Sequence, residues 1–329
     1  MVHHVSARVT VPLIALSLGL VALGCGETVA FSVLRAARVN VKAVAGDKEP
    51  TVAIGKWSAA NAAWQSAANE IAQGIREIVT SAPGGVVKFA EAGGAVTLSG
   101  ALNEHGYSET TRRERQQCSK YDEATKKYAN VACVKYTRSG AARLRVSMNV
   151  LDGAGKTLAA ETVPMSISKE TEVTVNVGDG DTSTDPPQID WDSTLAEMRR
   201  AAAAKLAEAV VPYPVVVAKP WFKCGPAENL CRVALGQIRS SDMVGARKTV
   251  DLALTQLTAA PAPDPKALAA AHWAMALACE FGGDYATAKE HVAKAITFDP
   301  AEEAFQQETA SIAREQANAK KLSEQGVSE

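Results

Sequence analysis

Cysteine thiols are the side chains with the widest range of chemistry in this chain, which holds six of them in 329 residues. Cys118 and Cys133 bracket a polar stretch, and Cys224 and Cys231 bracket a turn that contains Gly-Pro. In an oxidising compartment, two local disulfides are the simplest arrangement of such pairs. Zinc is the competing interpretation, but no Cys-x-x-Cys or histidine pair accompanies these residues. The sequence therefore predicts two disulfides and a free thiol at Cys279.

Candidates for catalysis are few. His105, His272 and His291 stand apart in the sequence, and an isolated histidine on a helix is usually a structural or surface residue. The chain has no nucleophile elbow, no zinc-binding His-Glu-x-x-His, no phosphate loop and no dinucleotide-binding glycine motif. An enzyme built on a carboxylate pair is the weakest alternative. We expect no catalytic residue, no metal site and no cofactor, so the protein is predicted not to be an enzyme.

The sixth cysteine, Cys25, ends an apolar run that begins at Val11 and follows the basic residue Arg8. The run is shorter than the roughly 20 residues of a membrane-spanning helix, and it has the pattern of an export signal. The stretch Ala22-Leu23-Gly24-Cys25 resembles the lipobox of bacterial lipoproteins. That resemblance implies a signal peptide over 1–24, cleavage before Cys25 and acylation of Cys25, palmitate included. An ordinary secretory signal and a short membrane anchor are the alternatives.

Charge and composition narrow the class of partner. The net charge is −1, so the chain lacks the basic surface that nucleic-acid binding requires. Hydrophobic residues make up 47% of the chain and aromatic residues only 5%. Much of the apolar content is alanine, which favours helices in close contact over a large aromatic-lined pocket. The chain is long enough for two domains of roughly 100–200 residues each.

The first half predicts an α/β or α+β domain over residues 25–215. Alternating residues predict strands, and a stripe of apolar residues at helical spacing predicts a helix over about 60–80. The densely charged stretch 110–130 is interpreted as a solvated loop or as a strand extension beyond the sheet. A capping box at Thr194–Glu197 predicts the start of a second helix. The expected strands are 29–33, 39–41, 51–57, 86–89, 96–102 and a β-rich stretch over 131–175 with a turn at 152–155.

This half resembles the lipoprotein family that includes the curli-secretion channel lipoprotein and the penicillin-binding-protein activator lipoproteins. Three places carry the likeness: Thr51-Val-Ala-Ile54 with the helix after it, Ala95-Val-Thr-Leu-Ser-Gly100, and the hairpin pattern from Ala142 to Thr162. The resemblance implies a lipid-anchored domain at the cell envelope. It also implies the alternative function, a component of an export or pore assembly.

The second half, 216–329, contains an internal repeat. Residues 241–254 realign on 283–296 with an offset of 42, and the pattern resembles the tetratricopeptide repeat. A generic pair of alanine-rich helical hairpins is the alternative. Residues 302–322 are expected to form a capping helix, and 211–220, with three prolines, is interpreted as the domain connector. The residues expected to pack the repeats are Ala246, Val250, Ala253, Ala276, Gly283, Tyr285, Ala288, Val292, Ala295 and Pro300.

These observations together predict a lipoprotein of the cell envelope, held by lipid on Cys25 and facing the periplasm from the outer membrane. Helical repeats present extended surfaces that suit protein partners. The predicted function is therefore a scaffold for protein–protein interaction, with the membrane and protein partners as its contacts.

Overall fold

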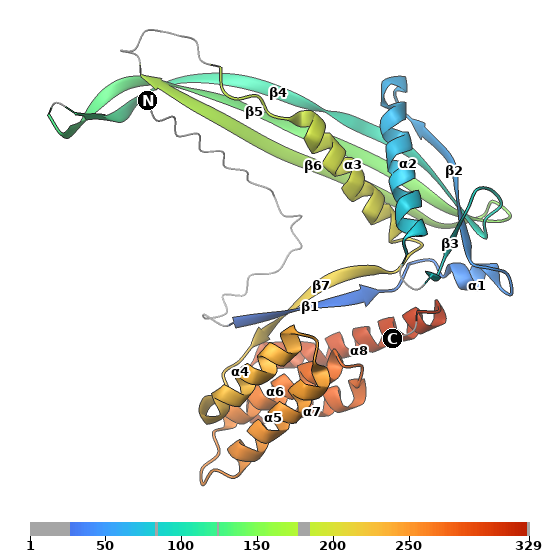
Figure 1. Cartoon of the computed structure of the whole chain (residues 1–329), viewed down its shortest axis with the longest axis vertical. Helices are drawn as coiled ribbons and strands as arrows, with labels where there is room; N and C mark the ends of the chain where they lie inside the picture. The colour runs from blue at the N-terminus through green and yellow to red at the C-terminus, as the bar shows by residue number, and fades with distance from the viewer. Residues whose placement is uncertain (1–26, 83–84, 124, 177–184, 328–329) are drawn as a thin grey trace. The chain divides into compact units, whose positions relative to one another are not determined.

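The structure is a computed structural model that describes residues 27–82, 85–123, 125–176 and 185–327 (Figure 1). The chain divides into two compact units. Within the described residues, unit 1 comprises 43–210, and unit 2 comprises 27–42 together with 211–327. The predicted signal peptide, 1–24, and the predicted lipid site, Cys25, lie outside the described residues. No helix in the described ranges is long and apolar enough to cross a membrane.

Unit 1 is built on a five-stranded mixed sheet in the order β3-β2-β4-β5-β6. Strand β2 runs parallel to β3 and to β4, whereas β4, β5 and β6 form an antiparallel meander. The strands are β2 (Thr51–Ala59), β3 (Lys88–Ala90), β4 (Val96–Asp122), β5 (Lys127–Asp152) and β6 (Thr157–Asn176). A parallel connection needs a crossover, which here carries a 3-10 turn, η1 (Ala62–Trp64), and helix α2 (Gln65–Thr80).

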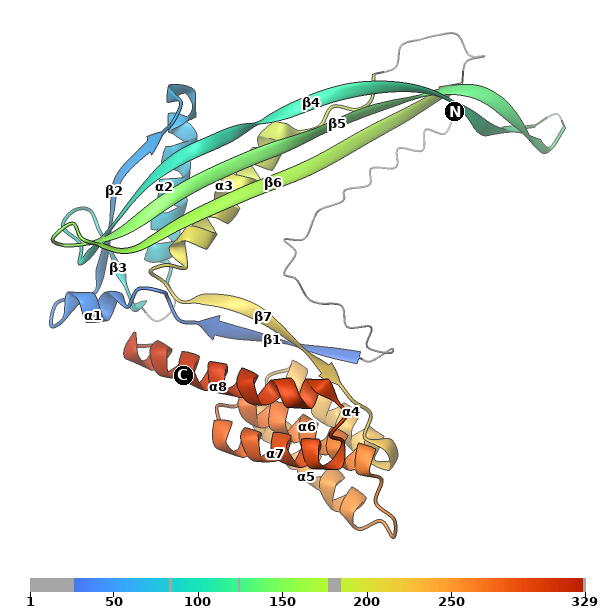
Figure 2. The same ribbon diagram turned by 180° about the vertical axis from the view of Figure 1, so that it is seen from behind.

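Two helices, α2 and α3 (Trp191–Ala207), cover one face of this sheet (Figures 1 and 2). The period-two pattern of β5 places Leu144 and Val146 in the core beneath them, while Arg143 and Arg145 face outward. The helices approach closely because Gly74 of α2 meets a small residue: a Cβ on Gly74 would lie 3.0 Å from that of Ala203. The predicted mixed α and β architecture of this half is therefore present.

The strands β4 and β5 form an arm that runs well past the helices (Figure 1). They are 27 and 26 residues long, or about 90 Å at about 3.3 Å per residue. The charged stretch 110–130 is thus a strand extension and not a solvated loop. Cys118 and Cys133 form the predicted disulfide across the arm, with Cα atoms 5.9 Å apart.

A polar junction attaches the start of α3 to the arm. Trp191 donates its indole N–H to Glu109 at 2.7 Å, and Arg138 binds the other oxygen of Glu109 at 2.9 Å. The helix begins three residues before the predicted capping box, because Asp190 accepts the N–H of Ser193 and serves as the N-cap. Thr194 is buried instead and donates its hydroxyl to the carbonyl of Asp190.

Unit 2 combines a two-stranded antiparallel ribbon, β1–β7, with helices that contact one another in chain order. Helix α6 is the centre of this unit and is buried on nearly every side. The elements are β1 (Glu27–Arg35), β7 (Tyr213–Trp221), η4 (Gly225–Ala227), α4 (Glu228–Arg239), α5 (Met243–Thr258), α6 (Pro265–Glu280), α7 (Tyr285–Phe298) and α8 (Glu303–Glu324). The second half therefore contains the expected helical region.

The ribbon changes two boundaries that the sequence predicted. Residues 211–220 are not a free connector, because β7 pairs with β1 along its whole length. Strand β1 consequently belongs to unit 2, although the sequence placed it in a domain spanning 25–215. The stretch 39–41 is also not a strand, since Val41 begins the short helix α1 (Val41–Ala45).

Gly140 provides a test of the junction between arm and helix. A Cβ at this position would meet the carbonyl oxygen of Ser108 and would lie 2.6 Å from Cζ2 of Trp191. We expect Gly140→Ala to destabilise unit 1 by about 1–3 kcal/mol, as overpacking usually does. Amide hydrogen exchange of β4, β5 and α3 measures the loss. Gly153→Ala is the matched control because its Cβ would meet nothing within 4 Å, and equal effects of the two changes would contradict the prediction.

Candidate functional site

The turns between paired helices of unit 2 match at the predicted offset of 42. Ser241 and Gly283 both have a left-handed backbone, with φ of 63° and 79°. Asp242 caps α5 by accepting the N–H of Gly245, and Asp284 caps α7 by accepting the N–H of Thr287. The backbone bond from Asp242 to Gln237 at 2.8 Å recurs from Asp284 to Cys279 at 2.9 Å. The two turns are therefore built alike.

The residues predicted to pack the repeats divide into two groups. The small and branched side chains are buried, whereas Gly283 and Pro300 are exposed near the two ends of α7, and Tyr285 is half-buried against the core. The buried positions are Ala246, Val250, Ala253, Ala276, Ala288, Val292 and Ala295.

The remaining cysteines are placed as the sequence predicted. Cys224 and Cys231 form a disulfide that joins the end of the ribbon to α4, with Cα atoms 6.3 Å apart. Cys279 is a free, buried thiol on α6, and burial raises its pKa. A buried thiol with a raised pKa is a poor nucleophile, so Cys279 is suited to packing.

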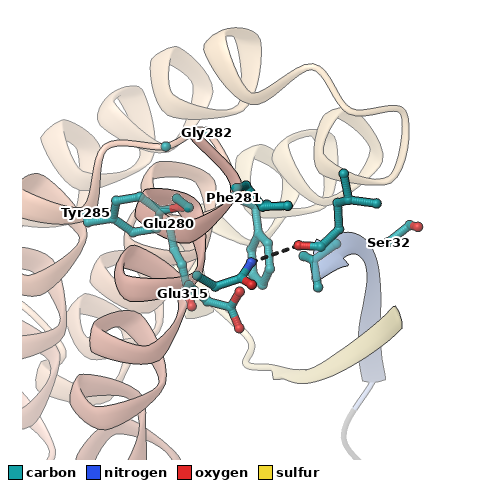
Figure 3. A pocket seen from close by; sticks show the side chains of 12 residues that line it. Ser32, Glu280, Phe281, Gly282, Tyr285 and Glu315 are labelled. Atoms are coloured by element: carbon teal, nitrogen blue, oxygen red, sulfur yellow. Dashed lines mark hydrogen bonds between the residues drawn. The ribbon is translucent and has the colours of Figure 1, made fainter. Parts of the chain in front are cut away.

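A cavity of about 380 Å³ lies within unit 2, between the edge of β1, the α6–α7 turn and α8 (Figure 3). Phe281 stacks on Phe31 at a ring-centroid distance of 3.5 Å and forms one wall. The other lining residues are Ser32, Val33 and Leu34 of β1, Glu280, Gly282, Gly283 and Tyr285 near the turn, and Glu315, Asn318, Ala319 and Leu322 of α8.

Glu280 is the unusual residue of this cavity. Glu280 is only 2% exposed, and no donor among the described residues hydrogen-bonds either of its carboxylate oxygens. Burial, then a side-chain hydrogen bond to Glu308 and the like charge of Glu308, raise the pKa of Glu280 to about 9. Glu280 therefore carries a proton at neutral pH unless a cation reaches it.

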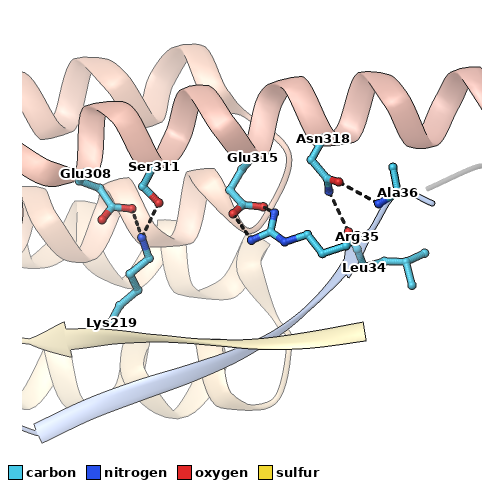
Figure 4. A network of polar contacts seen from close by, with 8 residues as sticks. All are labelled: Leu34, Arg35, Ala36, Lys219, Glu308, Ser311, Glu315 and Asn318. Carbon is cyan, nitrogen blue, oxygen red and sulfur yellow. Dashed lines mark hydrogen bonds and ion pairs between the residues drawn. The ribbon is translucent and has the colours of Figure 1, made fainter. Parts of the chain in front are cut away.

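The cations of this region are engaged with other carboxylates (Figure 4). Lys219 of β7 binds Glu308 at 2.5 Å and Ser311 at 2.8 Å. Arg35 of β1 makes two bonds to Glu315, at 2.5 and 2.6 Å. Glu308 and Glu315 thus each have a basic partner, whereas no basic side chain of the described residues donates a hydrogen bond to Glu280.

Two of the three described histidines contact each other, and the third lies in unit 1. His272 and His291 approach through their Nδ1 atoms at 2.9 Å, and burial, followed by the charge of His291, lowers the pKa of His272 to about 4. His105 instead contacts Arg199 at 3.0 Å. Within the described ranges, no group of three His, Cys, Asp or Glu side chains could hold a metal ion.

The sequence contains one signal for Glu280. At the repeat offset of 42, Glu280 corresponds to Ile238, which is buried in α4. An acid at a position that should carry an apolar side chain is a departure that alignment of the two copies reveals.

Neither a family model nor a curated protein matches this chain. Among solved structures, it is similar to a dodecamer of a PelC variant from Paraburkholderia phytofirmans. The identity is 11%, the match covers 56% of this chain and 98% of that chain, and the TM-score is 0.27. A similarity this weak supports no argument about fold or function.

The helix packing can be tested at Ala288, which is fully buried in α7. We expect Ala288→Leu to cost about 1–3 kcal/mol, because the larger side chain forces the neighbouring helices apart. Thermal unfolding measures the loss of stability, and hydrogen exchange shows whether the loss lies in α6 and α7. Ala286→Leu, on the exposed side of the same helix, should be close to neutral, and the reverse order would refute this packing.

The protonated state of Glu280 predicts a pH dependence. An acid whose pKa is raised on folding contributes stability that is complete below its unfolded pKa, near 4.5, and declines as the pH rises toward about 9. Glu280→Gln should therefore raise the free energy of unfolding by about 1–3 kcal/mol near neutral pH, with little change near pH 4.5. Denaturant titrations at the two pH values decide this, with Glu290→Gln, on the exposed face of α7, as control.

Proposed function

We propose that this protein is a lipid-anchored scaffold of the cell envelope, and that unit 2 binds a protein partner through tetratricopeptide-like repeats. The observation that carries the proposal is the matched pair of turns at 241–242 and 283–284. Helical hairpins that repeat in this way stack side by side and present broad surfaces that other proteins can bind.

The two disulfides support a location outside the cytoplasm. Cys118–Cys133 and Cys224–Cys231 are typical of a protein that folds outside the reducing cytoplasm. This agrees with the apolar run that ends at Cys25 and with the lipobox resemblance. Lipid on Cys25 would hold the scaffold at the membrane, where its partner would also be found.

Photo-crosslinking in the native envelope tests the scaffold. A photoreactive residue replaces Leu252 of α5, which is 60% exposed, or Leu158 of β6, which is 37% exposed. We expect one discrete adduct heavier than the chain from position 252 and none from position 158. Adducts at neither position, or only between copies of this chain, would contradict a scaffold role for unit 2.

A component of an export or pore assembly is the second candidate. It is favoured by the arm of unit 1: β2 pairs with β4 only as far as Leu102, and the rest of β4 pairs only with β5 among the described strands. A long strand edge of this kind is a template for pairing with another chain. The size of the detergent-extracted protein separates the candidates, because a pore requires a ring of subunits and a scaffold does not.

The lipid anchor is tested by Cys25→Ser. A protein held by several acyl chains stays in the membrane fraction, whereas one without them does not. We expect the variant to move to the soluble fraction or to remain unprocessed, as fractionation and intact-mass measurement will show. A variant that is processed normally and stays in the membrane would contradict the lipoprotein assignment.

A further inference from the structure

The outer edge of β1 is available for hydrogen bonding next to the cavity. In an antiparallel pair, facing residues alternate between those that bond each other and those whose N–H and C=O groups point to the outer edges. Pro214 and Pro220 lack an N–H and face Leu34 and Thr28, so these are the pairs that do not bond each other. Ser32 lies in the same phase, and its backbone N–H and C=O therefore point away from β7.

Contacts on either side agree with this phase. Leu34 accepts the amide of Asn318 at 2.8 Å, and Thr28 accepts Arg239 at 3.4 Å, both on the outer edge. Asn318 also accepts the N–H of Ala36 at 2.9 Å, as a neighbouring strand would. Ser32 borders the cavity, and its outward backbone N–H and C=O groups make no hydrogen bond to any described residue.

The cavity floor supplies the second half of a site. Glu280 occupies the position of Ile238 in the first hairpin, and a buried carboxylate that no donor reaches destabilises the fold unless a proton or a cation neutralises it. Figure 3 shows Glu280 and Glu315 on the α6 and α8 sides of the cavity and Ser32 on the β1 side. The outward backbone groups of Ser32 and a buried carboxyl group that no basic side chain neutralises thus border one cavity.

We propose that an extended segment of a partner protein adds to the edge of β1 at Ser32 and places a basic side chain in the cavity, against Glu280. This inference rests on the proposed scaffold function and names the chemistry of its partner. Main-chain hydrogen bonds to an open edge give affinity, and the pocket for one side chain gives specificity.

The surrounding charges select a cation. The groups that face Glu280 are Glu308 and Glu315 from α8 and Lys219 from β7, while Arg35 of β1 bonds to Glu315. Lys219 donates to Glu308 and Ser311, so an incoming ammonium or guanidinium group would take the place of the proton through which Glu280 bonds Glu308. The incoming cation replaces the proton on Glu280, and binding therefore releases a proton and strengthens as the pH rises.

Two capped pentapeptides test the site on the full chain: acetyl-Thr-Val-Lys-Val-Thr-amide, and the same peptide with norleucine in place of lysine. Calorimetry should show the lysine peptide binding about tenfold more tightly, as expected for a charge-assisted hydrogen bond. The preference should grow between about pH 6 and about pH 8, with proton release detected by comparing buffers. Equal affinities, or a preference that does not change with pH, would overturn the proposal.

Variants separate the two halves of the site. Glu280→Gln should abolish the preference for lysine, while Glu290→Gln keeps it. Ser32→Pro removes the outward N–H and should weaken both peptides, while Ser32→Ala should weaken neither. Persistence of the preference in Glu280→Gln would overturn the role of the cavity, and undiminished binding to Ser32→Pro would overturn edge pairing.

The scaffold and this site can fail independently. An adduct from position 252 together with equal affinities for the two peptides would leave the scaffold standing and overturn the basic-segment site. A lysine preference that depends on Glu280, with no adduct from position 252, would support the basic-segment site and overturn the scaffold.

Discussion

The pairing of β1 with β7 is the constraint on which the architecture depends. These strands lie on either side of the whole of unit 1 in the sequence, yet they pair residue by residue from Glu27↔Trp221 to Arg35↔Tyr213. Bringing such distant segments together costs loop-closure entropy, which grows only slowly with loop length. Burial of Val29 and Phe31 against the helices, and the bonds from Arg35 and Lys219 to α8, offset that cost.

Local patterns predicted the elements whose cause is local. Alternation from Leu144 to Val150 identified β5, and the chain offset of 42 identified the matching turns at Ser241 and Gly283. The β1–β7 pairing could not be predicted from the sequence. The choice of partner between distant strands depends on tertiary packing, which no short stretch of sequence encodes. The prolines of 211–220 indicated extended chain correctly but not its partner, and only the pairing shows that Pro214 and Pro220 share one phase.

The candidate site shows the same division. The composition favoured close-packed alanine-rich helices, which α6 and its neighbours are, but Glu280 belongs to no sequence motif. Its importance depends on burial, on the carboxylate of Glu308 beside it, and on the engagement of Lys219 and Arg35 with other acids. These are properties of four elements, α6, α8, β7 and β1, that meet in space. Only the correspondence with Ile238 was visible in the sequence.

The register of the ribbon also determines how the chain could be rearranged. Arg35 and Tyr213 are cross-strand neighbours, so the polypeptide leaves the ribbon and returns to it at adjacent points. Neighbouring strand ends of this kind are within reach of a two-residue turn. Unit 1 is thus an insertion in a hairpin, and its removal would leave unit 2 as one continuous polypeptide. Any domain whose own ends lie equally close could occupy the same place without altering the register of the ribbon.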